Sequence, residues 1–313
     1  MLRIYVRPAT ILTRSLRPRP NDHISTPKHS PRRFLLAILM HIMALARMHT
    51  QLPLFCMFIW TTLAANLNVS GEAITTRYWD CCKPSCGWKF KADVFNPVAT
   101  CAKDGSLVDV NEGTGCNGGN VFQCSSQQPW AINDTLAYGF AGAFLLPALA
   151  GGKLEAAWCC ACYRLDFTSD PLRGKSMVVQ ASNTAYDITT TNRFTLAIPG
   201  GNVSDVTACG LQYGVDQSVF GSHLTGVNSR EQCQNLPEVL RPGCQFRFDW
   251  MKGETFQSAR FERVVCPREI TDKSQCVRKD DATLANGTSA AASTSVRPWL
   301  LAVPLLSIAL TYS

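Results

Sequence analysis

The stretch Thr75-Thr-Arg-Tyr-Trp-Asp-Cys-Cys-Lys-Pro-Ser-Cys-Gly-Trp88 decides the fold, because it belongs to a longer series of cysteine-rich motifs. It sets one carboxylate, Asp80, directly before two adjacent cysteines. In isolation, an aspartate in this position is more often a turn or cap residue than a catalytic one. A tryptophan in isolation is likewise more often a core residue than a binding residue. The role of these residues must therefore be inferred together with the motifs in the rest of the chain.

Cysteine usage indicates an oxidised, secreted domain. Of fifteen cysteines, Cys56 lies in an apolar leader segment, and its removal leaves an even number that predicts seven disulfides. Sequons at Asn133, Asn202 and Asn286, with another at Asn68, predict glycosylation. No pair of C-x-x-C knuckles occurs, so neither a metal nor a cofactor is expected. The predicted disulfide cysteines are Cys81, Cys82, Cys86, Cys101, Cys116, Cys124, Cys159, Cys160, Cys162, Cys209, Cys233, Cys244, Cys266 and Cys276.

The formal charge of +7 lies at one end of the chain. Residues 1–33 hold eight basic side chains and one acidic side chain, whereas residues 74–289 hold 20 basic and 21 acidic side chains. A nucleic-acid-binding domain needs an excess of clustered Lys and Arg on its folded surface. The charge therefore argues against a nucleic-acid ligand.

Both ends of the chain resemble targeting segments. Residues 1–47 form a basic leader, and Met48 is the expected true start; the alternative is an uncleaved anchor or a second targeting element. Residues 48–73 are predicted to be a signal peptide, with cleavage behind Leu63-Ala-Ala65 or Gly71-Glu-Ala73. Residues 286–313 match a GPI-attachment signal, and a disordered tail is the alternative. The expected mature domain, residues 74–285, is secreted or held at the cell surface.

Hydrophobic alternation predicts a mainly β domain, and its short strands and Gly-containing loops indicate a barrel. Strands are predicted at Tyr163–Phe167, Met177–Gln180, Phe194–Ile198, Gln245–Trp250 and Arg260–Val265. One helix is predicted behind Asn133 or Asp134, through Leu136, Phe140 and Phe144. A second is predicted to open with the capping box at Ser229–Gln232 and to close at Pro242-Gly243.

Six motifs together resemble glycoside hydrolase family 45, the small secreted endo-β-1,4-glucanases, over about residues 75–281. This resemblance implies a six-stranded double-psi β-barrel with long disulfide-linked loops and a few short helices, as in expansins and barwin-like proteins. It also implies an open groove for a β-1,4-glucan chain and an inverting mechanism, and a monomer is expected. The motifs are the stretch 75–88, Gln128-Pro-Trp-Ala131, Trp158-Cys-Cys-Ala-Cys-Tyr163, Gly174-Lys-Ser-Met-Val-Val-Gln180, Ile198-Pro-Gly-Gly201 and Arg247-Phe-Asp-Trp250.

The family pattern assigns the general base to Asp80 and groove positions to Tyr78 and Trp88. It places the general acid in a strand reading x-x-Phe-Asp-Leu-x-Ile-Pro-Gly-Gly, where this chain has Asn192-Arg-Phe-Thr-Leu-Ala-Ile-Pro-Gly-Gly201. Thr195 therefore occupies the position of the acid. Strand alternation predicts that Thr195 faces the groove, opposite to the buried Phe194. A threonine hydroxyl does not donate a proton as a general acid near neutral pH, and this predicts weakened activity.

Two other aspartates are candidates to support or replace the missing acid. Asp187 matches a family aspartate on the loop that closes over the groove, and is expected to have a supporting or surrogate role. Asp205 is more simply a solvated loop residue. Arg193, beside Thr195, places a positive charge at the groove, which would lower the pKa of a neighbouring carboxyl and weaken it as an acid.

Two functions remain in competition, and Thr195 separates them. The first is a secreted cellulase that hydrolyses internal β-1,4 bonds. The second is a non-hydrolytic, expansin-like protein that binds β-glucan and loosens cell walls. A structural wall protein without a groove is disfavoured, since Tyr78, Asp80 and Trp88 stand together in the family motif. Ser-His-Asp or Cys-His catalysis is also disfavoured, because His223 alone follows the leader and lies in a glycine-flanked loop.

Overall fold

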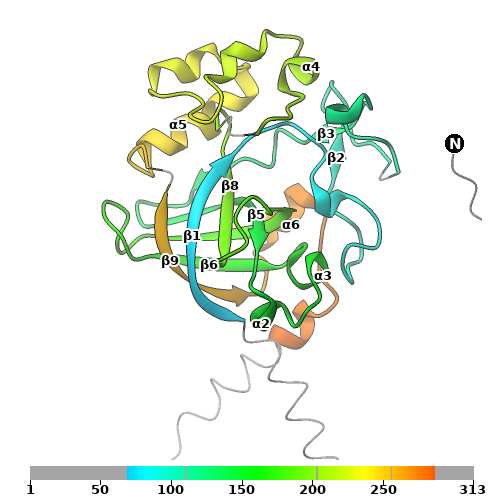
Figure 1. Ribbon diagram of the computed structural model, residues 1–313, viewed down its shortest axis with the longest axis vertical. Helices are drawn as coiled ribbons and strands as arrows, with labels where there is room; N and C mark the ends of the chain where they lie inside the picture. Colours follow the sequence, from blue (N-terminus) through cyan, green and yellow to red (C-terminus); the bar gives the residue numbers. More distant parts are fainter. Residues whose placement is uncertain (1–68, 110, 202–203, 255, 286–313) are drawn as a thin grey trace, which may run out of the picture. The chain divides into compact units, whose positions relative to one another are not determined.

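Six strands close into a barrel in the computed structural model (Figure 1). Hydrogen bonds join them in the order β5, β7, β6, β9, β1 and β8, and β8 pairs back onto β5. The β1–β8 and β5–β7 pairs are parallel, and the other pairs are antiparallel. The predicted six-stranded barrel is confirmed. The strands are β1 (Ser70–Tyr78), β5 (Leu136–Phe144), β6 (Cys162–Phe167), β7 (Ser176–Thr184), β8 (Arg193–Ala197) and β9 (Gln257–Val264).

Short elements fill the connections between the barrel strands. β4 (Trp130–Ala131) extends the sheet beside β5, and β2 (Thr100–Cys101) pairs with β3 (Phe122–Gln123). The α-helices are α2 (Pro147–Ala150), α3 (Glu155–Trp158), α4 (Cys209–Tyr213), α5 (Arg241–Asp249) and α6 (Arg268–Ser274). The 3-10 helices are η1 (Ser85–Gly87), η2 (Gly115–Asn117), η3 (Gln217–Phe220), η4 (Glu231–Asn235) and η5 (Glu238–Leu240).

The structure describes residues 69–109, 111–201, 204–254 and 256–285. The leader, most of the signal peptide, the GPI signal and the sequons at Asn68, Asn202 and Asn286 lie outside these residues. Asn133 is exposed, and its glycosylation stays a prediction. Within the described ranges, no helix is long and apolar enough to cross a membrane. These ranges also contain no group of three or more His, Cys, Asp or Glu side chains that could hold a metal ion.

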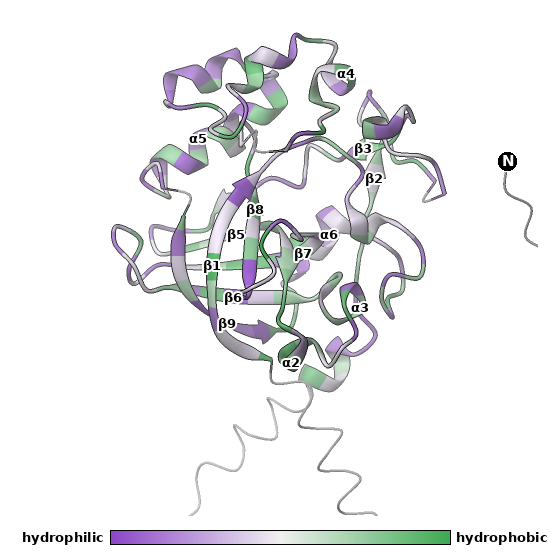
Figure 2. Ribbon diagram, viewed as in Figure 1, coloured by the Kyte–Doolittle hydropathy of each residue, from purple (hydrophilic) through white to green (hydrophobic). Residues whose placement is uncertain are grey.

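The barrel interior is packed with aromatic and aliphatic side chains. The rings of Tyr163 and Phe194 lie 5.1 Å apart, and Phe261 packs 5.3 Å from Phe194. These three residues come from β6, β8 and β9, so they join both sides of the closed sheet. Figure 2 shows hydrophobic residues recurring along the barrel strands. Burial of such large rings is a major stabilising contribution to the fold.

Four of the five strands predicted from the sequence are confirmed, and they correspond to β6, β7, β8 and β9. The helix predicted behind Asn133 was wrong, because Leu136–Phe144 forms β5. The Asn133 side chain accepts N–H bonds from Thr135 and Leu136, which makes a turn between β4 and β5 rather than a helix cap. Small residues then allow close packing: a Cβ at Gly139 would lie 2.5 Å from the Met177 Cε atom.

The strand predicted at Gln245–Trp250 was also wrong, because these residues belong to α5 and its C-terminal end. Phe246 and Trp250 stack with ring centroids 5.3 Å apart, which is the i, i+4 contact of a helix. The capping-box segment forms the 3-10 helix η4, in which the N–H of Gln232 bonds to Ser229 Oγ at 3.4 Å. Pro242 and Gly243 do not close that helix but lie in the first turn of α5, where proline is tolerated.

All seven predicted disulfides form among the fourteen cysteines. Three of the bridges span more than 100 residues of sequence each, and a fourth joins η1 to the end of α3, so they fix the connections around the sheet. Typical bridges contribute about 2 to 4 kcal/mol each to stability. The pairs are Cys81–Cys209, Cys82–Cys116, Cys86–Cys159, Cys101–Cys124, Cys160–Cys276, Cys162–Cys266 and Cys233–Cys244.

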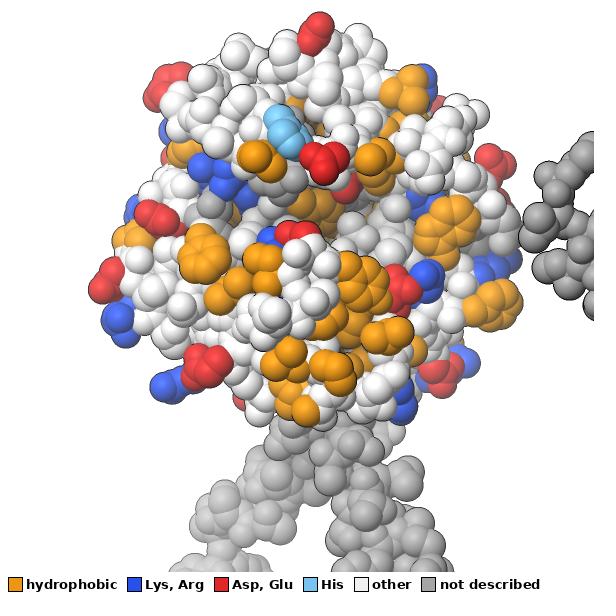
Figure 3. Space-filling model, viewed as in Figure 1, with side chains coloured by type: hydrophobic (Ala, Val, Ile, Leu, Met, Phe, Trp, Pro, Cys, Tyr) orange, Lys and Arg blue, Asp and Glu red, His pale blue; other side chains and the backbone are white. Residues whose placement is uncertain are grey.

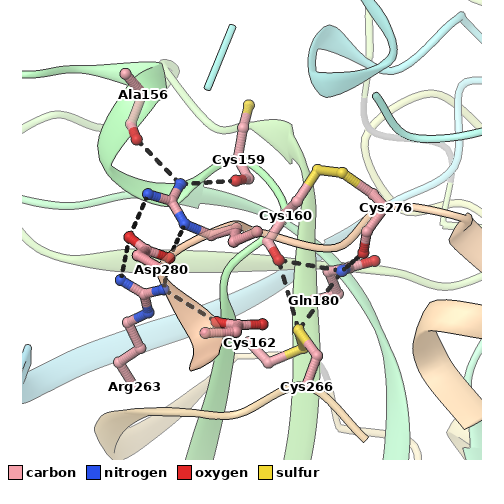
Figure 4. Close-up of polar contacts among 11 residues, drawn as sticks. Ala156, Cys159, Cys160, Cys162, Gln180, Arg263, Cys266, Cys276 and Asp280 are labelled. Atoms are coloured by element: carbon pink, nitrogen blue, oxygen red, sulfur yellow. Dashed lines mark hydrogen bonds and ion pairs between the residues drawn. A yellow bond between two sulfur atoms is a disulfide. The ribbon is translucent and has the colours of Figure 1, made fainter. Parts of the chain in front are cut away.

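A buried polar network fastens the last described residues to the barrel (Figure 4). Arg263 of β9 pairs with Asp280 and Asp281, and Arg278 donates to the carbonyl oxygens of Ala156 and Cys159, each at 3.0 Å. Burial would raise the pKa of Asp280, but hydrogen bonds from Arg278 and Arg263 outweigh it and hold that pKa well below its ordinary value. The network is therefore an ionised structural clamp.

Candidate active site

Asp80 lies immediately beyond the end of β1, and its backbone is held on two sides. Its carbonyl oxygen accepts hydrogen bonds from the Ala208 N–H at 2.8 Å and from Thr207 Oγ1 at 3.1 Å. Its Oδ1 atom accepts the N–H of Cys82 at 2.9 Å. Cys81 and Cys82 each form a disulfide, to Cys209 and Cys116 respectively. The carboxyl is therefore fixed at the end of a rigid strand.

The Asp80 carboxyl is half-buried. Burial raises its pKa to about 6, although the hydrogen bond from the Cys82 N–H opposes this shift. A carboxyl with this pKa exchanges protons near neutral pH, which is a property of acid–base residues in enzymes. Asp80 is thus suited to take a proton from water.

Tyr78 is the last residue of β1 and precedes Asp80 by two residues, and its side chain is only 6% exposed. Burial, followed by the charge of Asp80, raises the pKa of its phenol well above the ordinary value. The hydroxyl lies next to the side chains of Ser182 and Asn183 on β7. Since the ring is covered, Tyr78 is placed to support Asp80 and offers little open surface on which a sugar could stack.

Thr195 lies at the centre of β8, where the register sets it opposite Thr76 of β1. Its Oγ1 atom accepts a hydrogen bond from Thr76 Oγ1 at 3.1 Å. Phe194, the preceding residue, packs into the barrel interior against Tyr163 and Phe261. Phe194 and Thr195 therefore point to opposite faces, as strand alternation predicts. Thr195 lies on β8, and Asp80 lies two residues beyond the end of β1, the parallel strand that pairs with β8.

Arg193 joins the Thr195 hydroxyl to Asp187. Its Nε and NH2 atoms donate to Thr76 Oγ1 at 3.1 and 2.8 Å, and its NH1 atom lies 2.7 Å from Asp187 Oδ2. Arg193 is buried, whereas the Asp187 side chain is 62% exposed. The structure thus connects Asp187 to Thr195 through an ion pair with Arg193 and hydrogen bonds by way of Thr76. Asp205 is instead 90% exposed and pairs with His223 at 3.0 Å.

Trp88 follows η1 and is half-buried. The Lys83 ammonium lies 3.5 Å from the centroid of its ring and donates to the Glu112 carbonyl oxygen at 2.9 Å. The N–H of Ser85 in η1 donates to Asn183 Oδ1 at 2.9 Å, which links this segment to the neighbourhood of Tyr78. The predicted groove tryptophan is therefore held by contacts that reach the Asp80 site.

Figure 3 shows that one face of the molecule is hollowed between the loops that carry α4 and α5 and the barrel strands below them. Hydrophobic, acidic and basic side chains border this hollow. A hollow that both apolar and charged side chains border has the mixed lining that is usual for a ligand-binding surface.

The family model described as glycosyl hydrolase family 45 matches residues 71–277. The chain belongs to this family. This chain is similar to an endoglucanase from Cryptopygus antarcticus, with 44% identity over 215 residues that cover 68% of this chain and 92% of that protein. It is also similar to a Fusarium oxysporum protein, with 44% identity over 216 residues that cover 68% of this chain but only 55% of that protein.

A solved structure gives the same result for the fold. The crystal structure of a cellulase from the Antarctic springtail Cryptopygus antarcticus superposes with a TM-score of 0.63 at 44% identity. The match covers 67% of this family-45 chain and 98% of the springtail chain. The predicted family is therefore confirmed.

Several residues of the site were not predicted from the sequence. Thr76 could have been found, because it alternates with Tyr78 and Asp80 in the quoted stretch and so shares their side of β1. Thr207 gives no such signal, because it contacts the Asp80 carbonyl from 127 residues away. Asn183 likewise becomes a neighbour only through the pairing of the closed barrel.

Proposed function

We propose that this family-45 chain is an endo-β-1,4-glucanase that hydrolyses internal bonds of cellulose or a related wall glucan. The observation that carries the proposal is the half-buried Asp80 carboxyl, whose pKa of about 6 suits a general base. Similarity to the springtail endoglucanase supports the same activity. An uncharged glucan fits a domain with balanced charge, and the chain acts as a monomer without a cofactor.

In the proposed reaction, the Asp80 carboxylate removes a proton from water, and the water oxygen bonds to the anomeric carbon. The water attacks the face of the anomeric carbon opposite the leaving group. The glycosidic C–O bond breaks, its electron pair leaves with the departing sugar oxygen, and the configuration inverts. That oxygen must gain a proton. Thr195 positions the oxygen or a water molecule, and water supplies the proton, after which Asp80 returns its own proton to solvent. The acid step is therefore the slow one.

Asp187 supports this site through Arg193. Its carboxylate holds the guanidinium at 2.7 Å, and Arg193 in turn donates to Thr76, which donates to Thr195. Proton donation by Asp187 would break the ion pair, so a positioning role is favoured over a surrogate-acid role.

The rate of hydrolysis should depend on pH through Asp80. The base form increases as pH rises through about 6, so kcat/KM on carboxymethyl-cellulose should rise about tenfold per pH unit below 6 and level off above it. No descending limb is expected near neutral pH, because threonine does not titrate there. A pH–rate profile of the purified protein tests this, and a bell-shaped curve with an acid limb near neutrality would contradict it.

Loss of Asp187 should cost more activity than loss of Asp205. Asp187→Ala removes the partner of buried Arg193, whereas Asp205→Ala removes only an exposed contact to His223. We expect a drop of about tenfold in kcat/KM for the first variant and little change for the second. Initial rates on cellohexaose provide the measurement, and equal losses in the two variants would count against a role for Asp187.

The second candidate is a non-hydrolytic β-glucan-binding protein with an expansin-like effect. It is favoured by one observation, the threonine at the acid position. The two functions differ in whether the wild-type protein releases sugars in a manner that depends on Asp80.

Secretion is part of the proposal, and so are N-glycosylation and a GPI anchor at the cell surface. The seven disulfides support passage through an oxidising compartment. Signal cleavage behind Leu63-Ala-Ala65 is preferred to cleavage behind Ala73, because residues 70–73 pair with β9. The earlier site leaves β1 whole.

A further inference from the structure

Three large apolar side chains are exposed around α3. They are Phe90, Leu154 and Tyr186, with exposed fractions of 99%, 57% and 50%. We refer to these three residues as the α3 platform. Figure 3 shows hydrophobic side chains extending from the hollow across the part of this face that carries α2 and α3. Contiguous exposed apolar patches, in contrast to apolar residues exposed singly, mark interaction surfaces and ligand-binding grooves.

The backbone holds two of these side chains outward at a conformational cost. Phe90 has φ of +67° and Leu154 has φ of +48°, a left-handed region that bulky residues rarely adopt. Such conformations persist where the surroundings fix them, and they concentrate at functional sites. Here an ion pair between Lys91 and Glu155 joins the residues that follow each of them.

A hydrogen-bond network beneath the platform fixes these segments. Thr184 at the end of β7 is its centre: its Oγ1 atom donates to Glu155 Oε1 at 3.0 Å and accepts from Trp158 Nε1 at 3.2 Å. The same oxygen shares a hydrogen bond of 2.9 Å with Ser85 Oγ. The ring of Tyr186 packs 6.3 Å from the ring of Trp158. The platform is therefore preorganised by buried contacts.

The platform connects to the Asp80 site along two routes, one through its member Tyr186 and one through Ser85 beneath it. Tyr186 is followed directly by Asp187, whose carboxylate binds Arg193 beside Thr195. Ser85, which reaches Thr184, also donates its N–H to Asn183, a neighbour of Tyr78. A linear polymer that leaves the reaction site in this direction would therefore meet the platform.

We propose that the α3 platform binds further glucosyl units of the β-1,4-glucan chain, beyond those at the point of cleavage. Rings and aliphatic side chains cover the apolar faces of sugar rings. The Lys91–Glu155 pair supplies donors and acceptors for hydroxyl groups without adding net charge. This inference rests on the proposed glucanase function and adds a polymer-binding surface to it.

The test compares binding with cleavage in the full chain. The Phe90→Ser/Tyr186→Ser variant should bind amorphous cellulose about tenfold more weakly, which corresponds to about 1.4 kcal/mol. Its kcat/KM on cellotetraose should stay unchanged, because a short substrate does not reach the platform. A matched control, Phe256→Ser/Val239→Ser, removes apolar side chains with exposed fractions of 60% and 49% elsewhere. Phe90→Ser alone, which alters the most exposed ring, should weaken binding without affecting folding.

Unchanged cellulose binding by the double variant, or an equal loss in the control, would overturn the proposal. The proposal would also be overturned if the wild-type protein bound phosphatidylcholine vesicles but not cellulose, and if the same substitutions removed that vesicle binding. The binding assay does not depend on turnover. A chain that binds cellulose through the platform yet cleaves no glucan would therefore overturn the proposed hydrolysis and leave the platform assigned.

Discussion

Replacement of Thr195 by aspartate should accelerate cellohexaose cleavage by about 10²-fold. The new carboxyl would stand on β8 opposite Thr76, where it could protonate the departing sugar oxygen. General acid assistance typically contributes about 10²–10⁴-fold, and the lower end applies here because Arg193, two residues away on the same side of β8, favours the ionised form. Initial rates at several pH values provide the measurement.

The pH profile of Thr195→Asp gives a second readout. A descending alkaline limb should appear that the wild-type protein lacks, because the new acid loses its proton as pH rises. Thr195→Asn, which offers a polar side chain of similar shape without an acidic proton, is the matched control and should give no acceleration. Equal rates for Thr195→Asp and Thr195→Asn would contradict the assignment of the acid position.

Replacement of Asp80 by asparagine should remove hydrolysis while making the fold more stable. Loss of a general base costs about 10²–10⁴-fold in rate, which would bring an already slow enzyme to background. The folded-state pKa of Asp80 is raised to about 6 from an ordinary value of 3.8, so its ionisation opposes folding as pH rises between these values. Removing the charge should therefore stabilise the domain by about 2 to 3 kcal/mol at pH 7, with the difference vanishing below pH 4.

The matched control for this variant is Asp104→Asn. In the wild-type protein the Asp104 Oδ1 atom also accepts the N–H two residues ahead, that of Ser106, at 2.9 Å, but the Asp104 side chain is exposed. Hydrogen bonds from the Ser106 hydroxyl and then from the Ser106 N–H hold the pKa of Asp104 below its ordinary value, so the control should neither stabilise the fold nor alter the rate of hydrolysis. Thermal unfolding at pH 4 and pH 7 separates the two aspartates. A fall in the melting temperature of Asp80→Asn at pH 7 would contradict the raised pKa.

The sequence predicted the barrel because its strongest patterns are those of the strands and cysteines. Segments such as Phe194–Ile198 alternate clearly, and the even cysteine count required seven bridges without specifying their pairing. Leu136–Phe144 was predicted to be a helix because its large residues recur four apart, a spacing that a helix and a strand both allow. In Arg241–Asp249 the alternating pattern was real, but the disulfide and the ring stacking favour a helix.

The sequence predicted most residues of the candidate site but not how they meet. Asp80, Thr195, Arg193 and Asp187 came from their positions in the sequence, whereas Thr76 and the contacts that join Thr195 through Thr76 and Arg193 to Asp187 depend on strand register. Burial of Tyr78 could not be predicted from the motif, since it follows from contacts made by β7. A single sequence specifies which side chains occur, while pairing across the barrel decides which of them meet.

The most direct test of the account is proton NMR of cellohexaose during its first cleavage events, with wild-type protein and Asp80→Asn in parallel. With Asp80 acting as base in a single inverting step, the wild-type protein should release products whose new reducing end is the α-anomer, and Asp80→Asn should release none. Products that first appear as the β-anomer, or equal release by the two proteins, would contradict the account.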